Sequence, residues 1–288
     1  MPNTLLKKLL AACLAAAALA PAMAGCTAVP ADPEITVPPG SATPSADNAP
    51  RLELAAELDR YRSETGTDFS VALHDFSTGE AWTYNPDGRY LEASLVKLPI
   101  LLTLLRQATD EERELTAQEQ ALAELMICQS DNVATDSLYS LVGGAEELQK
   151  TYGLLGILHT QASEIWGANE TAAQDQLRIA AAVARGVDWI RSDLTAYAVA
   201  LTESVVPEQH WGITAGIGSA DTEVGLKNGW LQDDALVWNV GSAGFVLGAN
   251  TEYGIAILTA GAETLNEGIA ALEGAAAIVN RWELGSPG

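Results

Sequence analysis

The order of apolar and polar positions predicts strands near both ends of the chain. Residues 69–75 and 81–85 are β-rich and flank a Ser-Thr-Gly turn at 77–79, which indicates a hairpin. An amphipathic helix over residues 52–62 precedes this hairpin. Near the C-terminus the pattern predicts three more strands and a closing helix, over residues 224–231, 236–247, 253–259 and 262–282. We therefore expect the first and last strands to share one sheet, with the opening and closing helices packed on it.

The middle of the chain, from residue 94 to residue 205, is helical in pattern. We expect breaks at Pro99, at Gly143-Gly144 and between residues 153 and 167. The order strands, helices, strands, helix predicts a mixed α/β body made of a sheet with flanking helices and a separate, all-helical lobe. A cleft between lobe and sheet would be a usual place for a functional site.

The first 25 residues are typical of a signal peptide. A basic pair, Lys7-Lys8, precedes an apolar run over residues 9–20 that is too short to span a bilayer. The Met-Ala-Gly sequence before Cys26 resembles a bacterial lipobox, in which cleavage leaves the cysteine as a lipidated N-terminus. An ordinary secretory signal with a chance cysteine is the alternative. The prediction is an extracytoplasmic protein attached to the bacterial cell membrane by its lipid anchor only.

Residues 26–50 separate the signal peptide from the domain. They are rich in Pro, Ala, Ser and Thr, which predicts a disordered tether, and we place the folded domain at residues 51–288. Cys128 is the one cysteine left in that domain, so no internal disulfide is expected. Its apolar neighbours indicate a small buried residue rather than a reactive thiol.

Charge and composition exclude several classes of function. The formal net charge of −23 repels nucleic acid, so we expect no nucleic-acid partner. The three histidines, at 74, 159 and 210, are scattered, and H-E-x-x-H and a Gly-rich phosphate loop are both missing from the sequence. We therefore expect neither a metal nor a cofactor.

A Ser-x-x-Lys motif at Ser94 and Lys97 is the first candidate for chemistry. At a helix start these two side chains lie on one face, so the lysine amine can reach the serine hydroxyl. Serine needs such a base to become a nucleophile, and a helix N-terminus favours a developing oxyanion. A surface serine with a nearby lysine is the alternative.

Two further motifs follow in the chain. Ser130-Asp131-Asn132 separates two helical runs, which indicates a turn, although Asp131 is also a good helix cap. Lys227-Asn228-Gly229-Trp230 falls on a β-run. Its lysine could offer positive charge to a carboxylate, and its glycine would let a substrate backbone lie close to the strand. An ordinary solvent-facing strand lysine is the alternative here.

Together the three motifs resemble the Ser-x-x-Lys, Ser-Asp-Asn and Lys-Thr-Gly set of class A β-lactamases and related penicillin-binding proteins. The resemblance extends from about residue 52 to residue 282. It implies a β-lactamase/DD-peptidase-like fold of the α/β (α+β) type, with an antiparallel sheet. It also implies a serine acyl hydrolase whose partners are β-lactams or the D-Ala-D-Ala end of peptidoglycan stem peptides.

The same resemblance implies a role for each motif residue. Ser94 would attack the carbonyl, Lys97 would assist removal of its proton, and Ser130 would pass a proton to the leaving nitrogen. Substrate would be bound by Asn132, Lys227, Asn228 and Gly229, and the oxyanion hole would consist of the Ser94 and Trp230 N–H groups. Asn228 stands where threonine or serine is usual. Because an amide can still donate a hydrogen bond, we expect an altered affinity for substrate rather than a loss of binding.

The region of the Ω-loop departs furthest from the family pattern. Glu164 is the candidate deacylation base, but Glu164 and Asn169 are one residue out of register with the usual Glu and Asn. We interpret Glu170 as a first-turn acid of a helix that begins near Thr171. The expectation is a class A-like enzyme with slow deacylation. A non-catalytic cell-wall-binding lipoprotein that keeps the fold is the alternative.

Overall fold

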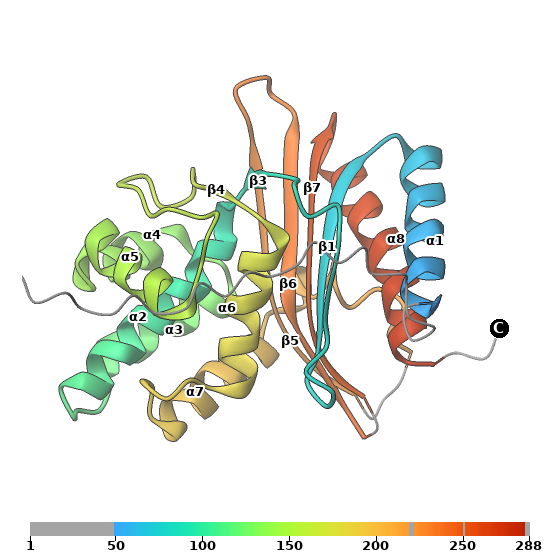
Figure 1. Ribbon diagram of the computed structural model, residues 1–288. Helices are drawn as coiled ribbons and strands as arrows, with labels where there is room; N and C mark the ends of the chain where they lie inside the picture. Colours follow the sequence, from blue (N-terminus) through green and yellow to red (C-terminus); the bar gives the residue numbers. More distant parts are fainter. Residues whose placement is uncertain (1–48, 219–221, 250, 286–288) are drawn as a thin grey trace, which may run out of the picture. The chain divides into compact units, whose positions relative to one another are not determined.

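A five-stranded antiparallel sheet is the centre of the protein (Figure 1). The computed structural model describes residues 49–218, 222–249 and 251–285. The strand order is β2-β1-β7-β6-β5, and every neighbouring pair is antiparallel. β1 pairs with β7, so the first and last strands share one sheet, as predicted. The strands are β1 (Asp68–Asp75), β2 (Ala81–Tyr84), β5 (Thr222–Gln232), β6 (Trp238–Gly248) and β7 (Glu252–Ala262).

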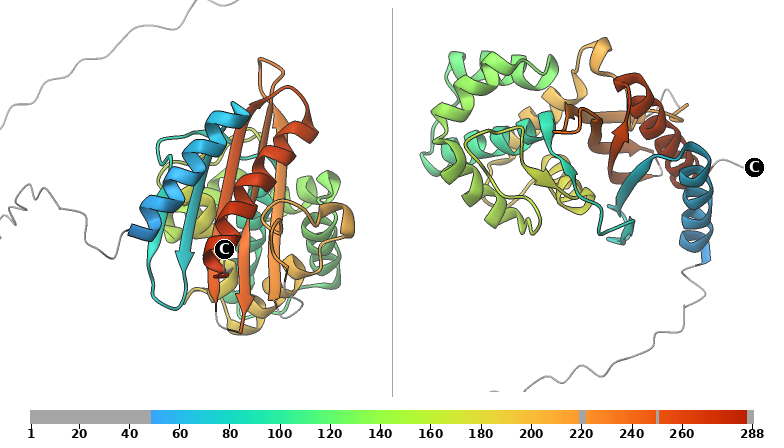
Figure 2. Two further views of the ribbon diagram at one scale, coloured as in Figure 1. Left: turned by 90° about the vertical axis from the view of Figure 1, so that its right-hand side faces the viewer. Right: turned by 90° about the horizontal axis from the view of Figure 1, so that it is seen from above.

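Helices cover both faces of this sheet. On one face α1 (Ala49–Thr65) and α8 (Leu265–Glu283) lie side by side (Figure 2). On the other face α6 (Ala173–Arg185) packs against β1, β6 and β7. These packing partners confirm the predicted sheet with flanking helices and the α/β (α+β) fold class. The predicted signal peptide and nearly all of the predicted tether lie outside the described residues.

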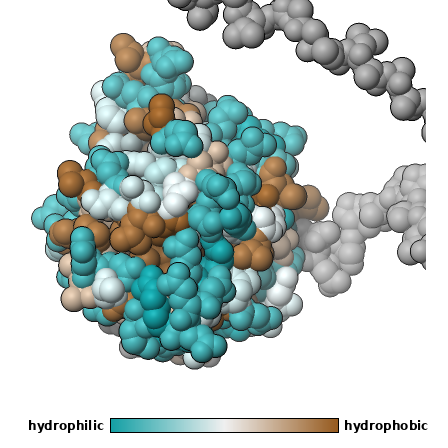
Figure 3. Space-filling view, turned by 90° about the vertical axis from the view of Figure 1, so that its left-hand side faces the viewer, coloured by the Kyte–Doolittle hydropathy of each residue, from teal (hydrophilic) through white to brown (hydrophobic). Residues whose placement is uncertain are grey.

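The remaining helices form the predicted lobe, whose centre is α2. Its side chains are buried around the whole helix, as expected of a helix enclosed by others. The lobe consists of α2 (Lys97–Asp110), α3 (Ala117–Cys128), α4 (Asn132–Leu141), α5 (Gly144–Leu155) and α7 (Ser192–Glu203). Its outer face mixes hydrophilic side chains with several separate hydrophobic patches (Figure 3).

The predicted helix break at Pro99 is wrong. Pro99 is the third residue of α2, where a backbone N–H has no acceptor within the helix, so proline is tolerated. The break at Gly143-Gly144 is confirmed, because α4 ends at Leu141 and α5 begins at Gly144. Both glycines have positive φ values, 96° and 62°, which few other residues adopt readily.

The interpretation of Glu170 as a helix acid is also wrong. Glu170 pairs with Leu91 in a short antiparallel ribbon of β3 (Tyr90–Leu91) and β4 (Glu170–Thr171). Helix α6 begins only at Ala173. Two-residue strands carry almost no sequence pattern, so this ribbon could not be predicted. It places the segment after α5 directly beside the residues that precede Ser94.

Two smaller expectations concern Cys128 and membrane spanning. Cys128 is buried at the end of α3, with its Sγ 3.4 Å from the carbonyl oxygen of Leu201, which confirms a packing role. Burial raises the pKa of its thiol. Within the described residues, every helix is too short or too polar to cross a membrane.

Candidate active site

Ser94 lies in a 3₁₀ turn, η2 (Ala93–Val96), that continues directly into α2. It is partly exposed, whereas its neighbours Ala93 and Leu95 are buried. Ala93 has a φ of 49°, which is uncommon for a residue with a side chain. The backbone N–H of Ala93 donates to the carbonyl of Gly167 at 3.0 Å, so the turn is held from outside. The predicted nucleophile is therefore fixed at the start of a helix.

Lys97 is completely buried and donates three hydrogen bonds. Its Nζ lies 2.6 Å from the carbonyl oxygen of Ser130, 3.1 Å from Ser130 Oγ and 2.8 Å from Asn132 Oδ1. None of these acceptors is Ser94, so the predicted contact with the Ser94 hydroxyl stays a prediction. Burial lowers the pKa of Lys97 to about 8, against the opposing pull of two aspartates. Part of the lysine is thus a free amine near neutral pH.

Ser130 joins the three motifs. Its Oγ accepts hydrogen bonds from both Lys97, at 3.1 Å, and Lys227, at 2.9 Å. Ser130 has a φ of 59° in the turn between α3 and α4, and this conformation turns its carbonyl to Lys97 as well. The structure therefore brings four predicted residues together: Ser130, Asn132, Lys97 and Lys227.

Asp131 caps α4, as the alternative interpretation of this motif proposed. Its Oδ1 accepts a hydrogen bond of 2.7 Å from the backbone N–H of Ala134. Capping does not conflict with catalysis, because the cap fixes the turn in which Ser130 lies. One residue thus holds the start of α4 while its neighbours face the two lysines.

Lys227 projects from β5 and is 1% exposed. Besides Ser130, its Nζ donates to the carbonyl of Asn228 at 3.0 Å. Burial and the nearby Lys97 hold the pKa of Lys227 well below its usual value. An anion bound near this lysine would favour its charged form, which suits the predicted carboxylate-binding role. The alternative of a solvent-facing lysine is wrong.

Gly229 is where β5 contacts the turn that carries Ser94. A Cβ atom on this residue would lie 2.9 Å from the backbone nitrogens of both Ser94 and Leu95, too close for any real side chain. Glycine is required here because the strand itself approaches η2, in addition to any approach by substrate. The adjoining Trp230 N–H, with that of Ser94, remains our predicted oxyanion hole. β5 is one of the two edge strands of the five-stranded sheet, so substrate could lie along it.

Asn228 and Trp230 direct their side chains elsewhere. Asn228 is fully buried, and its Nδ2 donates to the carbonyls of Gln209 and Trp211 at 2.7 and 3.2 Å. The Trp230 ring lies 5.8 Å from the ring of Trp211. The Asn228 amide thus holds the loop after α7 against β5. The structure gives no support to its predicted contact with substrate.

Glu164 is exposed on the loop between α5 and β4. It shares a hollow of that surface with Asp136 and Tyr139, and the hydroxyl of Tyr139 donates to the carbonyl of the preceding residue, Ser163, at 2.6 Å. In the described residues no hydrogen bond links its carboxylate to Ser94, Lys97 or Ser130. Its role as deacylation base stays a prediction without geometric support.

Sequence reasoning missed Trp166. The Lys97 Nζ lies 5.4 Å from the centre of the Trp166 ring, and the indole Nε1 donates to Asp136 Oδ1 at 2.8 Å. An aromatic residue within a loop of mixed composition gives no sequence signal for such a contact.

Glu92 was missed as well. It is completely buried, two residues before Ser94, and its hydrogen-bond partners are all neutral. Its carboxylate accepts hydrogen bonds from Tyr152 OH at 2.9 Å, Asn169 Nδ2 at 2.8 Å and Gln176 Nε2 at 3.0 Å. Burial raises the pKa of Glu92 to about 7. The sequence signal that could have pointed to Glu92 is an acidic residue in an otherwise apolar stretch.

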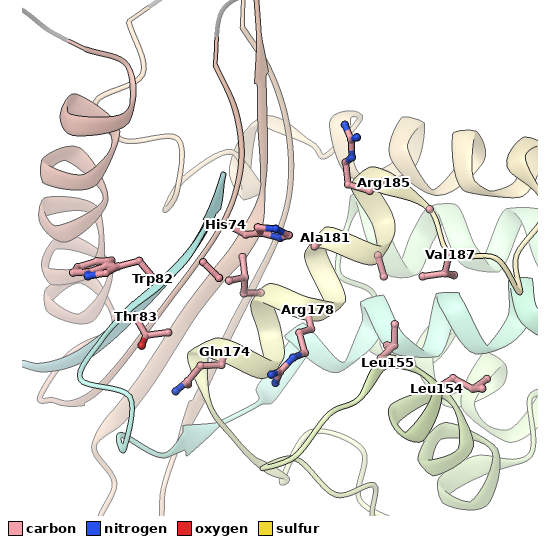
Figure 4. A pocket seen from close by; sticks show the side chains of 14 residues that line it. His74, Trp82, Thr83, Leu154, Leu155, Gln174, Arg178, Ala181, Arg185 and Val187 are labelled. Carbon is pink, nitrogen blue, oxygen red and sulfur yellow. The ribbon is translucent and has the colours of Figure 1, made fainter. Parts of the chain in front are cut away.

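A cavity of about 630 Å³ lies apart from these residues, between β1, β2 and α6 (Figure 4). His74 and Trp82 line it from the sheet, and Leu177, Arg178 and Arg185 line it from the helix. None of the motif residues contributes to its wall. The candidate active site is therefore defined by its converging polar groups rather than by the volume of a cavity.

Comparison with known proteins agrees with this geometry. The model of the Beta-lactamase enzyme family matches residues 53–120 and 113–282, so the chain belongs to that family. Family and fold together identify a serine hydrolase. A sequence search of curated proteins finds no match.

Solved structures share the fold at low identity. A class A β-lactamase from Bacteroides cellulosilyticus superimposes with a TM-score of 0.72 at 18% identity, covering 82% of this chain and 99% of that one. The class A β-lactamase from Mycobacterium abscessus gives 0.68 at 18% identity, covering 81% and 100%. The protein PBP-A gives 0.67 at 21% identity, covering 80% and 95%. A mutant of PBP-A is described as an acyl-enzyme complex with penicillin G.

Proposed function

We propose that the protein forms an acyl-enzyme at Ser94 with β-lactams or with the D-Ala-D-Ala end of peptidoglycan stem peptides, and hydrolyses it slowly. The observation that carries this proposal is the sharing of Ser130 Oγ by Lys97 and Lys227, at 3.1 and 2.9 Å. A hydroxyl between two buried amines is suited to relay a proton. A protein that only bound cell wall would need neither these amines nor a nucleophile.

Acylation would begin with transfer of the Ser94 proton to the free amine of Lys97. The Ser94 Oγ bonds to the carbonyl carbon, and the N–H groups of Ser94 and Trp230 stabilise the oxyanion. The carbon–nitrogen bond then breaks, and Ser130 gives its proton to the leaving nitrogen while it regains one from the Lys97 ammonium. Lys227 contributes positive charge close to Ser130, which favours ligands that carry a carboxylate.

Deacylation would lack an efficient base. General-base assistance is typically worth about 10²- to 10⁴-fold in rate. Glu164 is exposed and unconnected to the site, and the Asn169 amide is bonded to Glu92 at 2.8 Å. We therefore expect behaviour closer to that of a penicillin-binding protein than of an efficient β-lactamase.

We also propose that the protein is extracytoplasmic, with Cys26 lipidated and the domain held at the bacterial cell membrane. The support is the lipobox-like sequence before Cys26, which lies outside the described residues. Metabolic labelling with a fatty-acid analogue should tag the wild type and spare Cys26→Ala.

A fluorescent penicillin tests the enzymatic proposal. It should label wild-type protein and the control Ser137→Ala, which alters an exposed serine on α4. It should fail to label Ser94→Ala. Retention of the label in Ser94→Ala would refute the assignment of the nucleophile. Failure to label wild type, together with binding to peptidoglycan, would favour the non-catalytic alternative.

A further inference from the structure

Trp166 covers the buried amine on which acylation depends. The Nζ of Lys97 lies 5.4 Å from the centre of the Trp166 ring, while its hydrogen bonds go to Ser130 and Asn132. The one polar atom of the indole, Nε1, is bonded to Asp136 at 2.8 Å. The ring therefore presents only its apolar surface to Lys97.

The loop that carries Trp166 contacts the chain at both ends of the Ser-x-x-Lys motif, just before Ser94 and at Lys97. At the first end, the Ala93 N–H donates to the carbonyl of Gly167 at 3.0 Å. At the other end, the ring of Trp166 lies over Lys97. The carbonyl of Trp166 also accepts a hydrogen bond of 3.3 Å from Asn169 Nδ2. The ring cannot turn away from Lys97 without breaking its bond to Asp136.

We propose that Trp166 is the positioning residue that keeps the acyl-enzyme long-lived, because its ring denies water access to Lys97 and the Ser94 ester together. This inference rests on the proposed function. Hydrolysis requires water oxygen to bond to the ester carbonyl carbon while a base takes its proton. The bond from that carbon to Ser94 Oγ then breaks, and Oγ regains the proton as the acid leaves. Lys97 carries the amine of the Ser-x-x-Lys motif, and its Nζ lies 5.4 Å from the centre of the Trp166 ring as well as within hydrogen-bond distance of Ser130 and Asn132.

The ring has two opposite effects on the charge of Lys97. An aromatic face attracts a cation, which favours the ammonium. Exclusion of water favours the free amine. Burial, to which the Trp166 ring contributes together with the rest of the site, is the largest cause of the lowering of the pKa of Lys97 to about 8. Removing the ring should therefore raise the pKa of Lys97 and move the acid limb of acylation to higher pH.

The test compares Trp166→Ala and Trp166→Phe with wild type. Acylation and deacylation of full-length protein by penicillin G are followed by intact mass over a range of pH. Trp166→Ala should lose its adduct at least about tenfold faster, given the size of general-base effects, and its acylation should need higher pH. Trp166→Phe keeps an apolar ring and should stay close to wild type. Trp189→Ala is the matched control, since Trp189 is half-buried against the same core.

A second variant keeps the inference testable if Trp166→Ala does not fold. Asp136→Ala lies on the exposed side and removes the anchor of the indole Nε1, together with one of the two carboxylates that raise the pKa of Lys97. It should accelerate adduct loss part of the way. Unchanged adduct lifetimes in both variants would overturn the inference while leaving acylation intact. Failure of wild type to form any adduct would instead refute the proposed function.

Discussion

Gly229 on the edge strand β5 lies against the backbone nitrogen of Ser94. A Cβ on residue 229 would approach that nitrogen to 2.9 Å. The glycine of the third motif is thus required in part by packing, because the strand and the turn that carries Ser94 touch without a side chain between them. The geometry of the proposed oxyanion hole depends on this contact, since Trp230 follows Gly229 directly.

Gly229→Ala should strongly impair acylation with little loss of fold. The added methyl group must displace the backbone at Ser94, and a shift of about 1 Å in a reacting group can cost about 10²-fold in rate. The rate of fluorescent-penicillin labelling measures this effect. Gly218→Ala serves as control, because a Cβ there meets open space. Wild-type labelling by Gly229→Ala would contradict the predicted oxyanion hole.

The two lysines should have separable effects. Lys97→Ala should abolish acylation, because the segment that follows Ser94 offers no other lysine as a base. Lys227→Ala should mainly weaken capture of anionic substrates. Because the pKa of Lys97 is about 8, wild-type acylation should rise as pH increases towards 8 and the free amine accumulates. Stopped-flow measurement of acylation over a range of pH follows the titration of Lys97. Comparison of paired anionic and neutral esters isolates the contribution of Lys227. Equal acylation of the two esters by wild type would count against the role of Lys227.

The sequence predicted the main elements because most of them have a clear pattern. The apolar runs of β5, β6 and β7 and the helices α1 and α8 lie within a few residues of the expected positions. Ser94, Lys97, Ser130 and Lys227 could be found because their spacing and order carry the resemblance. Contacts between loops could not be predicted, and the two-residue strands β3 and β4 have too few residues to show a period.

The side-chain directions of Glu164 and Trp166 could not be predicted from the sequence. That of Asn228 could have been, because side chains alternate along a strand and Asn228 therefore faces away from the side of Lys227. Its amide donates to two carbonyls of the loop after α7. Glu164 is exposed and Trp166 faces Lys97, and both directions depend on how the loop folds onto Ala93.

Glu92 should make stability depend on pH. Its pKa rises from an ordinary 4.5 to about 7 on burial, so the folded protein holds a proton that the unfolded chain releases. The corresponding stability is fully present below pH 4.5 and is lost as pH rises through 7. At about 1.4 kcal/mol per pKa unit, the loss amounts to roughly 3 kcal/mol.

Glu92→Gln removes this titration. In urea unfolding, the stability of wild type relative to Glu92→Gln should fall between pH 4 and pH 8. Glu170→Gln, an exposed acid on β4, should run parallel to wild type. A constant difference between wild type and Glu92→Gln across this range would contradict the buried, proton-holding carboxyl.

Glu164→Gln should leave penicillin turnover nearly unchanged. The side chain is exposed, and its loop directs Trp166 rather than Glu164 to Lys97. Steady-state hydrolysis of nitrocefin after the initial burst provides the measurement. A variant that traps the adduct while wild type hydrolyses rapidly would identify Glu164 as a working base and the protein as a true β-lactamase.

The most direct test of the account is the intact mass of the protein after exposure to penicillin G. We predict one covalent adduct per chain that forms rapidly, maps to Ser94, persists after excess penicillin is removed and is lost in Ser94→Ala. Rapid return of the unmodified mass with complete hydrolysis of penicillin, or an adduct that remains in Ser94→Ala, would contradict it.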